Sequence, residues 1–295
     1  MNPRTFVSGF YETHGRAGAY TVAPVLNSRV LDLPFHVERC ATSAMMLSGL
    51  PRLSGGVDRS AGFESALRRK LVAEGLLEGI ESGLLTICAV VKGEADWEVQ
   101  TLVTRTPTRE EMASPAEAGF VDVTRALQRT MPLAKATSWT VDRVAVEKMR
   151  LKGAAETLLV AGDDDAVLEG LVSNFYCVKG GSTLYTAPRG TVLPGSMGNL
   201  VEQLAIHLGF NIVEQSPRLQ DCHAWDTAFL TSATKPIVPI RRIVDHTSGE
   251  LRTVYDAPVQ HPTSLFSLLT TTLRQGLFIQ EPSLLEETMG RRLWF

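Results

Sequence analysis

The stretch Leu168–Asn199, LEGLVSNFYCVKGGSTLYTAPRGTVLPGSMGN, decides how this chain is interpreted. It holds an acidic residue beside a glycine, a Ser-Asn pair, an apolar run typical of a strand, a threonine-rich turn and a Leu-Pro-Gly turn. A helix is predicted to follow that last turn. Because a helix N-terminus offers unpaired N–H groups and a positive dipole end, this segment is suited to binding a phosphate.

Residues 18–105, upstream of this stretch, alternate between extended and helical patterns. Asn27-Ser28 separates two short extended runs and predicts a hairpin. Further elements are expected where apolar residues recur at helical or alternating spacing: helices over Phe35–Leu47 and Phe63–Gly79, and strands over Leu84–Val91 and Glu98–Arg105. Residues 106–118 begin TPTREEMASPA, with two prolines, charges and no apolar periodicity, and are predicted to be a linker.

The remainder of the chain is rich in strand patterns with interspersed helices. We expect helices over Asp142–Lys152, Asn199–Leu208, Ser264–Gln275 and Pro282–Gly290, and strands over Thr157–Ala161, Ser173–Val178, Thr183–Thr186, Phe210–Glu214, Ala228–Thr231 and Ile237–Arg242, with more between Ile243 and Val254. The sequence therefore predicts a two-domain α and β protein: a small domain over 1–105, a linker over 106–118 and a larger domain over 119–295.

The composition excludes several classes of protein. The 295 residues are 44% hydrophobic and 21% charged with a formal net charge of −3, which gives no basic surface for nucleic acid or an anionic membrane. No apolar run reaches the roughly 18 residues of a membrane helix, and the N-terminus lacks the pattern of a signal peptide, so a cytoplasmic location is expected. The four cysteines have no C-x-x-C spacing and are expected to be reduced and mostly buried, with no metal site.

The order of these motifs resembles the class IV aminotransferase family, which binds pyridoxal phosphate and has the type IV fold. In that family a segment reading roughly EG-x-x-SN-x-F-x-V, then L-x-T-P, then LPG, builds much of one wall of the cofactor site. The resemblance runs from about Gly18 to about Ile243. It implies a small N-terminal α/β domain, a larger strand-rich C-terminal domain and a homodimer with shared active sites.

Pyridoxal phosphate chemistry needs a lysine that forms a Schiff base and moves a proton, and a carboxylate that keeps the pyridine nitrogen protonated. Lys135 stands thirty-four residues ahead of Glu169, a separation that resembles that of the two groups in the family. The run from Lys135 through Gly153 to Glu156 also resembles the family's K … G-x-x-E. The flanking residues of Lys135 are apolar, and burial of a lysine lowers its pKa and makes the amine nucleophilic.

The resemblance also implies which residues bind the phosphate. Arg39, in FHVERC, matches the arginine of the family's H-x-x-R-L, and a guanidinium fork suits a phosphate. Two turns complete the set, one at Ser196 and Met197 after Leu-Pro-Gly and one at Ser232 and Ala233. Asn174 matches the family's Ser-Asn pair and is expected to tie the cofactor-binding strand to its neighbours.

On the substrate side the chain departs from its relatives. Many members carry a tyrosine four or five residues after the lysine, where this chain has Trp139 and Thr140. Leu85–Val91 also lacks the substrate-binding arginine of branched-chain aminotransferases, so that pocket is not carried over. Tyr20 matches an aromatic position that often lines the substrate side, and Tyr20 and Trp139 are the substrate-binding candidates.

The predicted activity is transfer of an amino group from an amino acid or amine to a 2-oxo acid through a Lys135 Schiff base. Three alternatives stay open. The first is a lyase of the same fold, resembling aminodeoxychorismate lyase, because the spacing from Lys135 to Gly153 fits that branch as well. The second is a non-catalytic protein that binds the cofactor, and the third is an unrelated two-domain protein.

Overall fold

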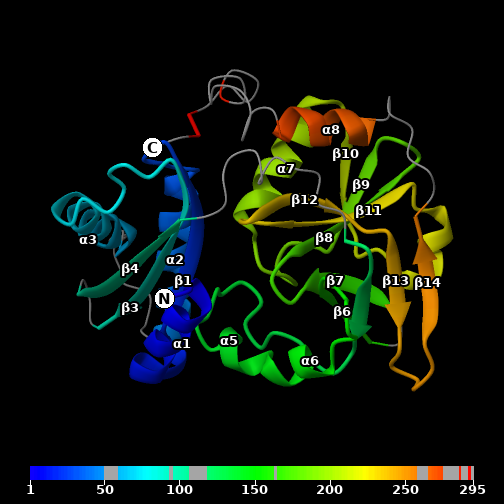
Figure 1. The fold of residues 1–295 in the computed structure, drawn as a ribbon, viewed down its shortest axis with the longest axis horizontal. Helices are drawn as coiled ribbons and strands as arrows, with labels where there is room; N and C mark the ends of the chain where they lie inside the picture. Colours follow the sequence, from blue (N-terminus) through cyan, green and yellow to red (C-terminus); the bar gives the residue numbers. More distant parts are fainter. Residues whose placement is uncertain are drawn as a thin grey trace. The chain divides into compact units, whose positions relative to one another are not determined.

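The chain is described by a computed structural model and consists of two compact units, each with its own sheet and core (Figure 1). Unit 1 comprises Met1–Thr108, Leu133–Asp142 and Arg292–Phe295, and unit 2 comprises Arg109–Pro132 and Arg143–Arg291. The structure describes residues 1–49, 59–92, 96–105, 118–162, 165–257, 265–274, 286 and 292–293. The predicted domain boundaries stay a prediction, since all of the predicted linker except Ala118 lies outside the described residues.

Unit 1 is built on a four-stranded antiparallel sheet in the order β2-β1-β3-β4. Its elements are α1 (Pro3–His14), η1 (Gly15–Ala17), β1 (Ala19–Leu26), β2 (Arg29–Val30), α2 (Leu33–Ser48), α3 (Arg59–Ala73), β3 (Ser82–Val91), β4 (Trp97–Arg105) and α5 (Trp139–Asp142). The predicted hairpin is confirmed: Asn27 and Ser28 join β1 to β2, and both have positive φ angles, 48° and 59°.

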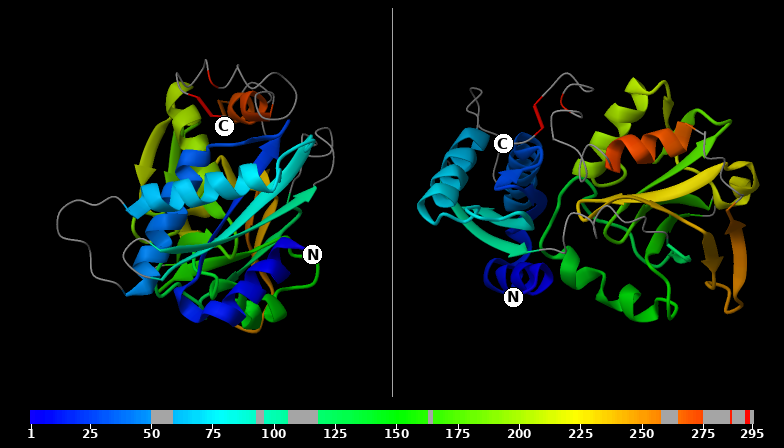
Figure 2. Two further views of the ribbon diagram at one scale, coloured as in Figure 1. Left: turned by 90° about the vertical axis from the view of Figure 1, so that its left-hand side faces the viewer. Right: turned by 45° about the horizontal axis from the view of Figure 1, so that its top comes forward.

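The two faces of this sheet are covered by different helices, as the alternation along β1 requires. Ala19, Ala23 and Val25 belong to the core that the sheet forms with α2 and α3. Tyr20 and Val22 point the other way and join a smaller cluster with residues of α1. In the left view of Figure 2, α3 lies in front of the strands. One face of β1 therefore packs against α2 and α3, and the other face packs against α1.

Two predictions for unit 1 need correction. The helix expected over Phe63–Gly79 ends at Ala73, because the chain then turns through Gly75 and Gly79, whose φ angles are positive. Helix α1 was not predicted, although its start carries a helix signal: Asn2 accepts a hydrogen bond from the Thr5 N–H (2.9 Å), and Pro3 is the first helical residue.

Unit 2 contains a ten-stranded mixed sheet with the central order β10-β9-β8-β7-β6-β5-β13-β14; β11 pairs with β8, and β12 pairs with β11. Its elements are β5 (Val121–Thr124), α6 (Val144–Met149), β6 (Thr157–Ala161), β7 (Ala166–Gly170), β8 (Asn174–Lys179), β9 (Thr183–Thr186), α7 (Ser196–His207), β10 (Asn211–Glu214), η2 (Leu219–Ala224), β11 (Thr227–Ser232), β12 (Lys235–Pro239), β13 (Arg242–Asp245), β14 (Arg252–Asp256) and α8 (Leu265–Arg274).

Helix α7 is the element of unit 2 that matters most for the site. Its buried face includes Leu200, Val201 and Leu204, at the spacing of an amphipathic helix, and Gly209 follows its end with φ 90°. It contacts β10, β11 and β12, and it lies beside α8 in Figures 1 and 2. The first turn of α7 is thus fixed against the sheet.

Most of the predicted strands of unit 2 are confirmed, and Thr157–Ala161 and Thr183–Thr186 have the predicted bounds. The helix expected over Asp142–Lys152 is instead two short helices, interrupted at Arg143, where the chain passes from unit 1 to unit 2. The strand expected over Ile237–Arg242 ends at Pro239, and β13 begins at Arg242. The helix expected over Pro282–Gly290 lies outside the described residues, apart from Glu286, which is helical.

No helix in the described ranges is long and apolar enough to span a membrane. The four cysteines are free, as predicted; three are buried and Cys222 is half-buried.

Candidate active site

Lys135 is held in unit 1 through its backbone. Its N–H donates to Ser43 Oγ (3.0 Å), and its carbonyl oxygen accepts from the Tyr20 N–H (2.9 Å). The side chain is half-buried, and Nζ lies 4.7 Å from the centroid of the Tyr20 ring. A cation over an aromatic face is stabilised by the ring's quadrupole. The backbone of Lys135 is therefore fixed against β1 and α2, and its amine lies over the Tyr20 ring.

Arg39 lies on the same face of α2 as His36 and Ser43, since the three residues follow helical spacing. Its guanidinium is buried, with a relative accessibility of 7%, and burial lowers its pKa to about 10. The guanidinium carbon lies 5.2 Å from the centroid of the Phe35 ring. A guanidinium suits an anionic ligand such as a phosphate, because its fork donates parallel hydrogen bonds.

Glu169 lies at the end of β7 and forms an ion pair within unit 2. Its Oε1 accepts from Arg129 Nε (2.6 Å), and its Oε2 accepts from the Leu193 N–H (3.3 Å). Both side chains are almost fully buried, with accessibilities of 7% for Arg129 and 4% for Glu169. The negative charge of the Glu169 carboxylate is thus balanced by Arg129, and each of its oxygens accepts a hydrogen bond. Arg129 was not predicted as a site residue, although it stands only six residues before Lys135.

Asn174 ties the Leu-Pro-Gly turn to the sheet. Its Nδ2 donates to the Leu193 carbonyl oxygen (2.7 Å), and a Cβ at Gly195 would lie 1.9 Å from its Oδ1. Gly195 therefore has to be glycine for the turn to pack against Asn174. Because Leu193 also bonds Glu169, a single residue links the acidic side chain to the start of α7. The tying role predicted for Asn174 agrees with these contacts.

Glu156, the last residue of the K … G-x-x-E run, has a structural role. Its carboxylate accepts from the N–H groups of Thr157 (2.9 Å) and Val172 (3.3 Å) and from Ser173 Oγ (3.3 Å). It lies so near Gly170 that a Cβ there would be 2.9 Å from its Cγ and 2.3 Å from Ser173 Oγ. Burial raises the pKa of Glu156. The glycine beside Glu169 is thus explained by the packing of the β7–β8 turn.

The first turn of α7 has the character of an anion site. The residue at its N-cap, Gly195, offers no side-chain hydrogen bond, and the first turn carries no acidic residue. Ser196 and Met197 are buried there, with accessibilities of 8% and 2%. Thr231 Oγ1, 3.6 Å from where a Cβ of Gly198 would lie, is buried and has no hydrogen-bond partner among the described residues. Backbone N–H groups and an orphaned hydroxyl together suit a phosphate.

The space beside Gly198, in the first turn of α7, is filled by the Tyr176 side chain. A Cβ at Gly198 would lie 2.6 Å from the hydroxyl oxygen of Tyr176. That hydroxyl donates to Glu202 Oε1 (2.8 Å) one turn further along α7. Burial is the main cause that raises the pKa of Tyr176 well above its ordinary value. Tyr176 thus holds α7 in place.

The second predicted phosphate turn is the connection between β11 and β12. Ser232 pairs with Lys235, its Oγ accepts from the Lys235 N–H (3.2 Å), and it lies 3.3 Å from Thr234 Oγ1. Ala233 stands at the tip of the turn. The hydroxyl of Ser232 therefore already stabilises the hairpin, and the turn's further contribution would come from its backbone.

Each unit gathers its own predicted residues. Unit 1 brings Tyr20, Arg39 and Lys135 together. Unit 2 links Glu169 and Asn174 to the start of α7, which contacts β11 and β12. Trp139, a candidate for the substrate side, is 4% accessible in α5.

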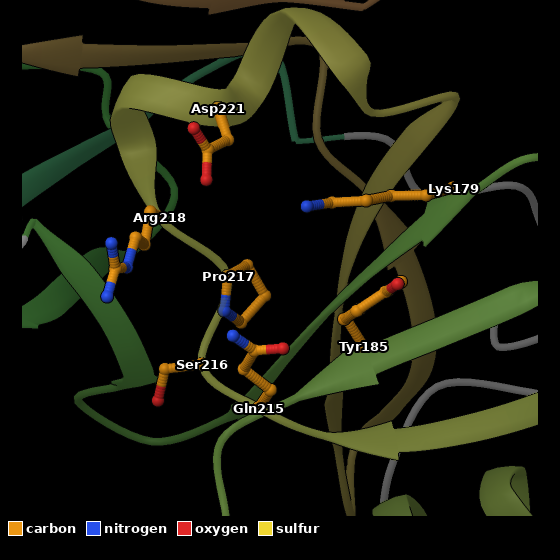
Figure 3. Close-up of a pocket in the computed structure, with 7 residues that line it drawn as sticks. All are labelled: Lys179, Tyr185, Gln215, Ser216, Pro217, Arg218 and Asp221. Carbon is orange, nitrogen blue, oxygen red and sulfur yellow. The ribbon is translucent and has the colours of Figure 1, made fainter.

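A separate pocket of about 250 Å³ lies in unit 2 beside the end of β8 (Figure 3). Its lining includes Lys179, Tyr185, Gln215 and Asp221, and Figure 3 shows the Lys179 ammonium and the Asp221 carboxylate directed into the same space. Lys179 Nζ lies 4.7 Å from the centroid of the Tyr185 ring. None of the predicted site residues lines this pocket.

Comparison with known proteins places the chain in a family. Residues 18–243 match the family described as amino-transferase class IV. No curated protein matches the chain. Solved structures share the fold: a branched-chain aminotransferase from Thermoproteus uzoniensis with norvaline (20% identity, TM-score 0.66, covering 93% of this chain and 90% of that one) and a hypothetical aminotransferase from Mycobacterium tuberculosis in its PLP-bound form (17%, 0.63, 92% and 91%).

A putative 4-amino-4-deoxychorismate lyase from Legionella pneumophila is similar in fold to the same degree, with 16% identity, a TM-score of 0.65 and coverage of 90% of this chain and 92% of that one. The chain belongs to the class IV aminotransferase family, whose members are enzymes that use pyridoxal phosphate. The predicted fold class is confirmed. At these identities the solved structures carry the fold alone.

Proposed function

We propose that this protein is an aminotransferase that moves an amino group from an amino acid or amine to a 2-oxo acid, with pyridoxal phosphate attached at Lys135. The observation that carries the proposal is the fixed position of the Lys135 amine over Tyr20, with Arg39 buried in the same unit. The backbone of Lys135 is bonded to β1 and α2, and its amine lies next to an aromatic ring, so unit 1 defines the position of this lysine. The family match supplies the reaction class.

The residues present fit the cofactor group by group. Arg39 supplies a buried guanidinium, and the start of α7 supplies N–H groups next to the orphaned Thr231 hydroxyl, so both suit the phosphate. Glu169 is buried, oriented by Leu193 and compensated by Arg129, so it suits the pyridine nitrogen. Met197 and Ala233 have no polar side chain and would therefore contribute to the phosphate site through their backbone.

Pyridoxal phosphate supplies an electron-withdrawing ring that stabilises negative charge at the α-carbon of a bound amine. Lys135 would hold the cofactor covalently and would carry a proton to and from that carbon, since its amine is the basic group available for the task. Glu169 would keep the ring nitrogen protonated through a charge-assisted hydrogen bond. Arg39, Ser196, Met197, Ser232 and Ala233 would bind and orient the phosphate. Tyr20 and Trp139 remain the candidates for the substrate side.

The test uses the purified protein loaded with pyridoxal phosphate and no acceptor. Pools of L-amino acids, D-amino acids and (R)-amines are added separately, and the near-visible absorbance and the released 2-oxo product are recorded. Conversion of the cofactor to its amine form with one equivalent of 2-oxo product supports the transaminase. A cofactor band that every pool leaves unchanged would contradict it.

The same experiment with aminodeoxychorismate as the substrate distinguishes the lyase hypothesis from the transaminase. Release of pyruvate without conversion of the cofactor to its amine form would establish elimination. The putative lyase from Legionella pneumophila, similar in fold, is the reason to include this substrate. We also infer a homodimer with shared active sites, and sedimentation of the purified protein tests whether it is a dimer.

A further inference from the structure

Arg39 is held by a buried hydrogen-bonded chain that includes Thr21 and His36. One of its terminal nitrogens, Nη2, donates to Thr21 Oγ1 (2.5 Å), and Thr21 Oγ1 lies 2.7 Å from His36 Nδ1. The direct path from Arg39 Nη2 to His36 Nδ1 is longer, 3.5 Å. Thr21 and His36 are both 0% accessible. All three residues belong to unit 1, so the chain connects the middle of β1 to one face of α2.

The direction of each hydrogen bond follows from the donors present. A guanidinium only donates, so Thr21 Oγ1 accepts from Arg39 and keeps its own hydrogen for His36 Nδ1. Nδ1 is then the acceptor, and the imidazole carries its hydrogen on Nε2. The opposite tautomer would leave the Thr21 hydrogen without an acceptor and would place an N–H next to the positive guanidinium. The tautomer is inferred from this network.

The charge state of His36 agrees with this assignment. Burial lowers the pKa of His36 well below its ordinary value, and the positive charges of Arg39 and Lys135 lower it further. A neutral imidazole can accept at Nδ1, whereas an imidazolium cannot. Its Nε2 has no hydrogen-bond partner among the described residues, which is a cost at a fully buried position. The hydrogen bond from Thr21 to Nδ1 offsets part of the cost of this unpartnered Nε2.

We propose that Thr21 and His36 are positioning residues that hold the Arg39 guanidinium in one orientation, pre-set to bind the cofactor's phosphate. The Phe35 ring, which lies over the guanidinium, also restricts its position. Pre-organisation of this kind lowers the conformational entropy lost on binding. The proposal rests on the proposed function, because the phosphate is that of pyridoxal phosphate, and it adds two residues that reach the cofactor only through Arg39.

The experiment compares two forms of the cofactor and a matched pair of variants. Wild type, Thr21→Val and Thr21→Ser are titrated with pyridoxal phosphate and with pyridoxal, which lacks the phosphate. The complex is reduced with borohydride, and the modified fraction is measured by mass spectrometry. Thr21→Val removes the hydroxyl at nearly constant shape. It should weaken binding of pyridoxal phosphate roughly 10-fold, the effect of one hydrogen bond to a charged group, and leave pyridoxal nearly unchanged. Thr21→Ser should resemble wild type.

A second pair tests the other end of the chain and guards against misfolding. His36→Asn keeps an acceptor near the position of Nδ1, and His36→Leu removes it. Binding of pyridoxal phosphate should fall in the order wild type, His36→Asn, His36→Leu, with pyridoxal again nearly unchanged. Thermal unfolding of each variant without cofactor shows that it is folded.

The outcomes separate the two proposals. Equal losses for pyridoxal phosphate and pyridoxal would assign Thr21 and His36 a purely structural role and overturn the positioning role. Wild-type affinity of Thr21→Val for pyridoxal phosphate would overturn it as well. If wild type itself gives no reducible adduct with either compound, the proposed function fails, and the positioning role fails with it.

Discussion

The residues predicted to serve the cofactor differ in kind between the two units. Unit 1 gathers two cations, Lys135 and Arg39, around a histidine that is kept neutral. Unit 2 presents one acidic group whose charge is balanced by Arg129, together with backbone N–H groups at the start of α7. Unit 1 thus supplies reactive and charged side chains, whereas unit 2 supplies orientation. Mutations of Lys135, Arg39 or Glu169 should act mainly on the ligand, and mutations of the groups that support them should act mainly on stability and geometry.

The largest effect on stability is expected at the ion pair of unit 2. Arg129→Met leaves the Glu169 carboxylate buried without its main counter-charge and should lower the free energy of unfolding by about 3–5 kcal/mol. Urea unfolding without cofactor measures it. The double variant Arg129→Met, Glu169→Leu removes both charges and should recover most of the loss. A single variant as stable as wild type would show that the pair does not organise unit 2.

Glu169→Gln should keep the cofactor bound and slow removal of the donor's α-proton about 100-fold, since one pre-organised electrostatic contact is lost. The rate is measured by NMR as exchange of the donor's α-proton in D₂O. Asn174→Ala, which removes the hydrogen bond to the Leu193 carbonyl oxygen without adding a charge, serves as a comparison for general disturbance of the turn. An unchanged exchange rate in Glu169→Gln would mean that another group holds the ring nitrogen.

A methyl group at Gly198 tests how tightly α7 is placed. Gly198→Ala puts a Cβ 2.6 Å from the Tyr176 hydroxyl oxygen, and overpacking of this kind costs about 1–3 kcal/mol of unfolding free energy. Adding Tyr176→Phe removes the clashing atom and should restore part of the loss. The two effects are compared by thermal unfolding. Simple additivity of the two substitutions would contradict the contact.

The smallest effect concerns pH and returns to unit 1. Below about pH 6.5 the unfolded chain takes up a proton on His36, while the folded chain does not, because burial, Arg39 and Lys135 hold its pKa low. This histidine should therefore reduce stability as the pH falls, by at most about 1.4 kcal/mol per pH unit. Urea unfolding at pH 7.5 and 5.5 should show a smaller decrease for His36→Asn than for wild type. Equal decreases would indicate that His36 is protonated in the folded state.

Local patterns predicted much of the fold. The alternation and turn residues of β6, β9 and the β1–β2 hairpin are properties of short segments, and these elements were predicted closely. The bounds of α3 and the break at Arg143 were not, because they depend on glycine turns and on where the chain passes between units. Helix α1 and strand β5 carried signals too short to be recognised.

The candidate site residues were predicted from the order of the motifs. The residues that hold them in place through hydrogen bonds and ion pairs were not predicted. Arg129 pairs with Glu169 across 40 residues, and Glu156 braces a turn 16 residues away, so neither contact has a local signature. Thr21 follows Tyr20 in a strand and carries no distinguishing pattern. Such partners become visible only once β1 and α2, or β7 and the α7 turn, are folded together. The roles of the predicted site residues toward the cofactor stay predictions.

The measurement that tests the account most directly is the location of the cofactor. Wild type and Lys135→Ala are loaded with pyridoxal phosphate, reduced with borohydride, digested and mapped by peptide mass. The account predicts one modified lysine, Lys135, in wild type and no modified peptide in the variant, which should remain folded. A modified peptide that persists in Lys135→Ala, or that maps to another lysine in wild type, would contradict it.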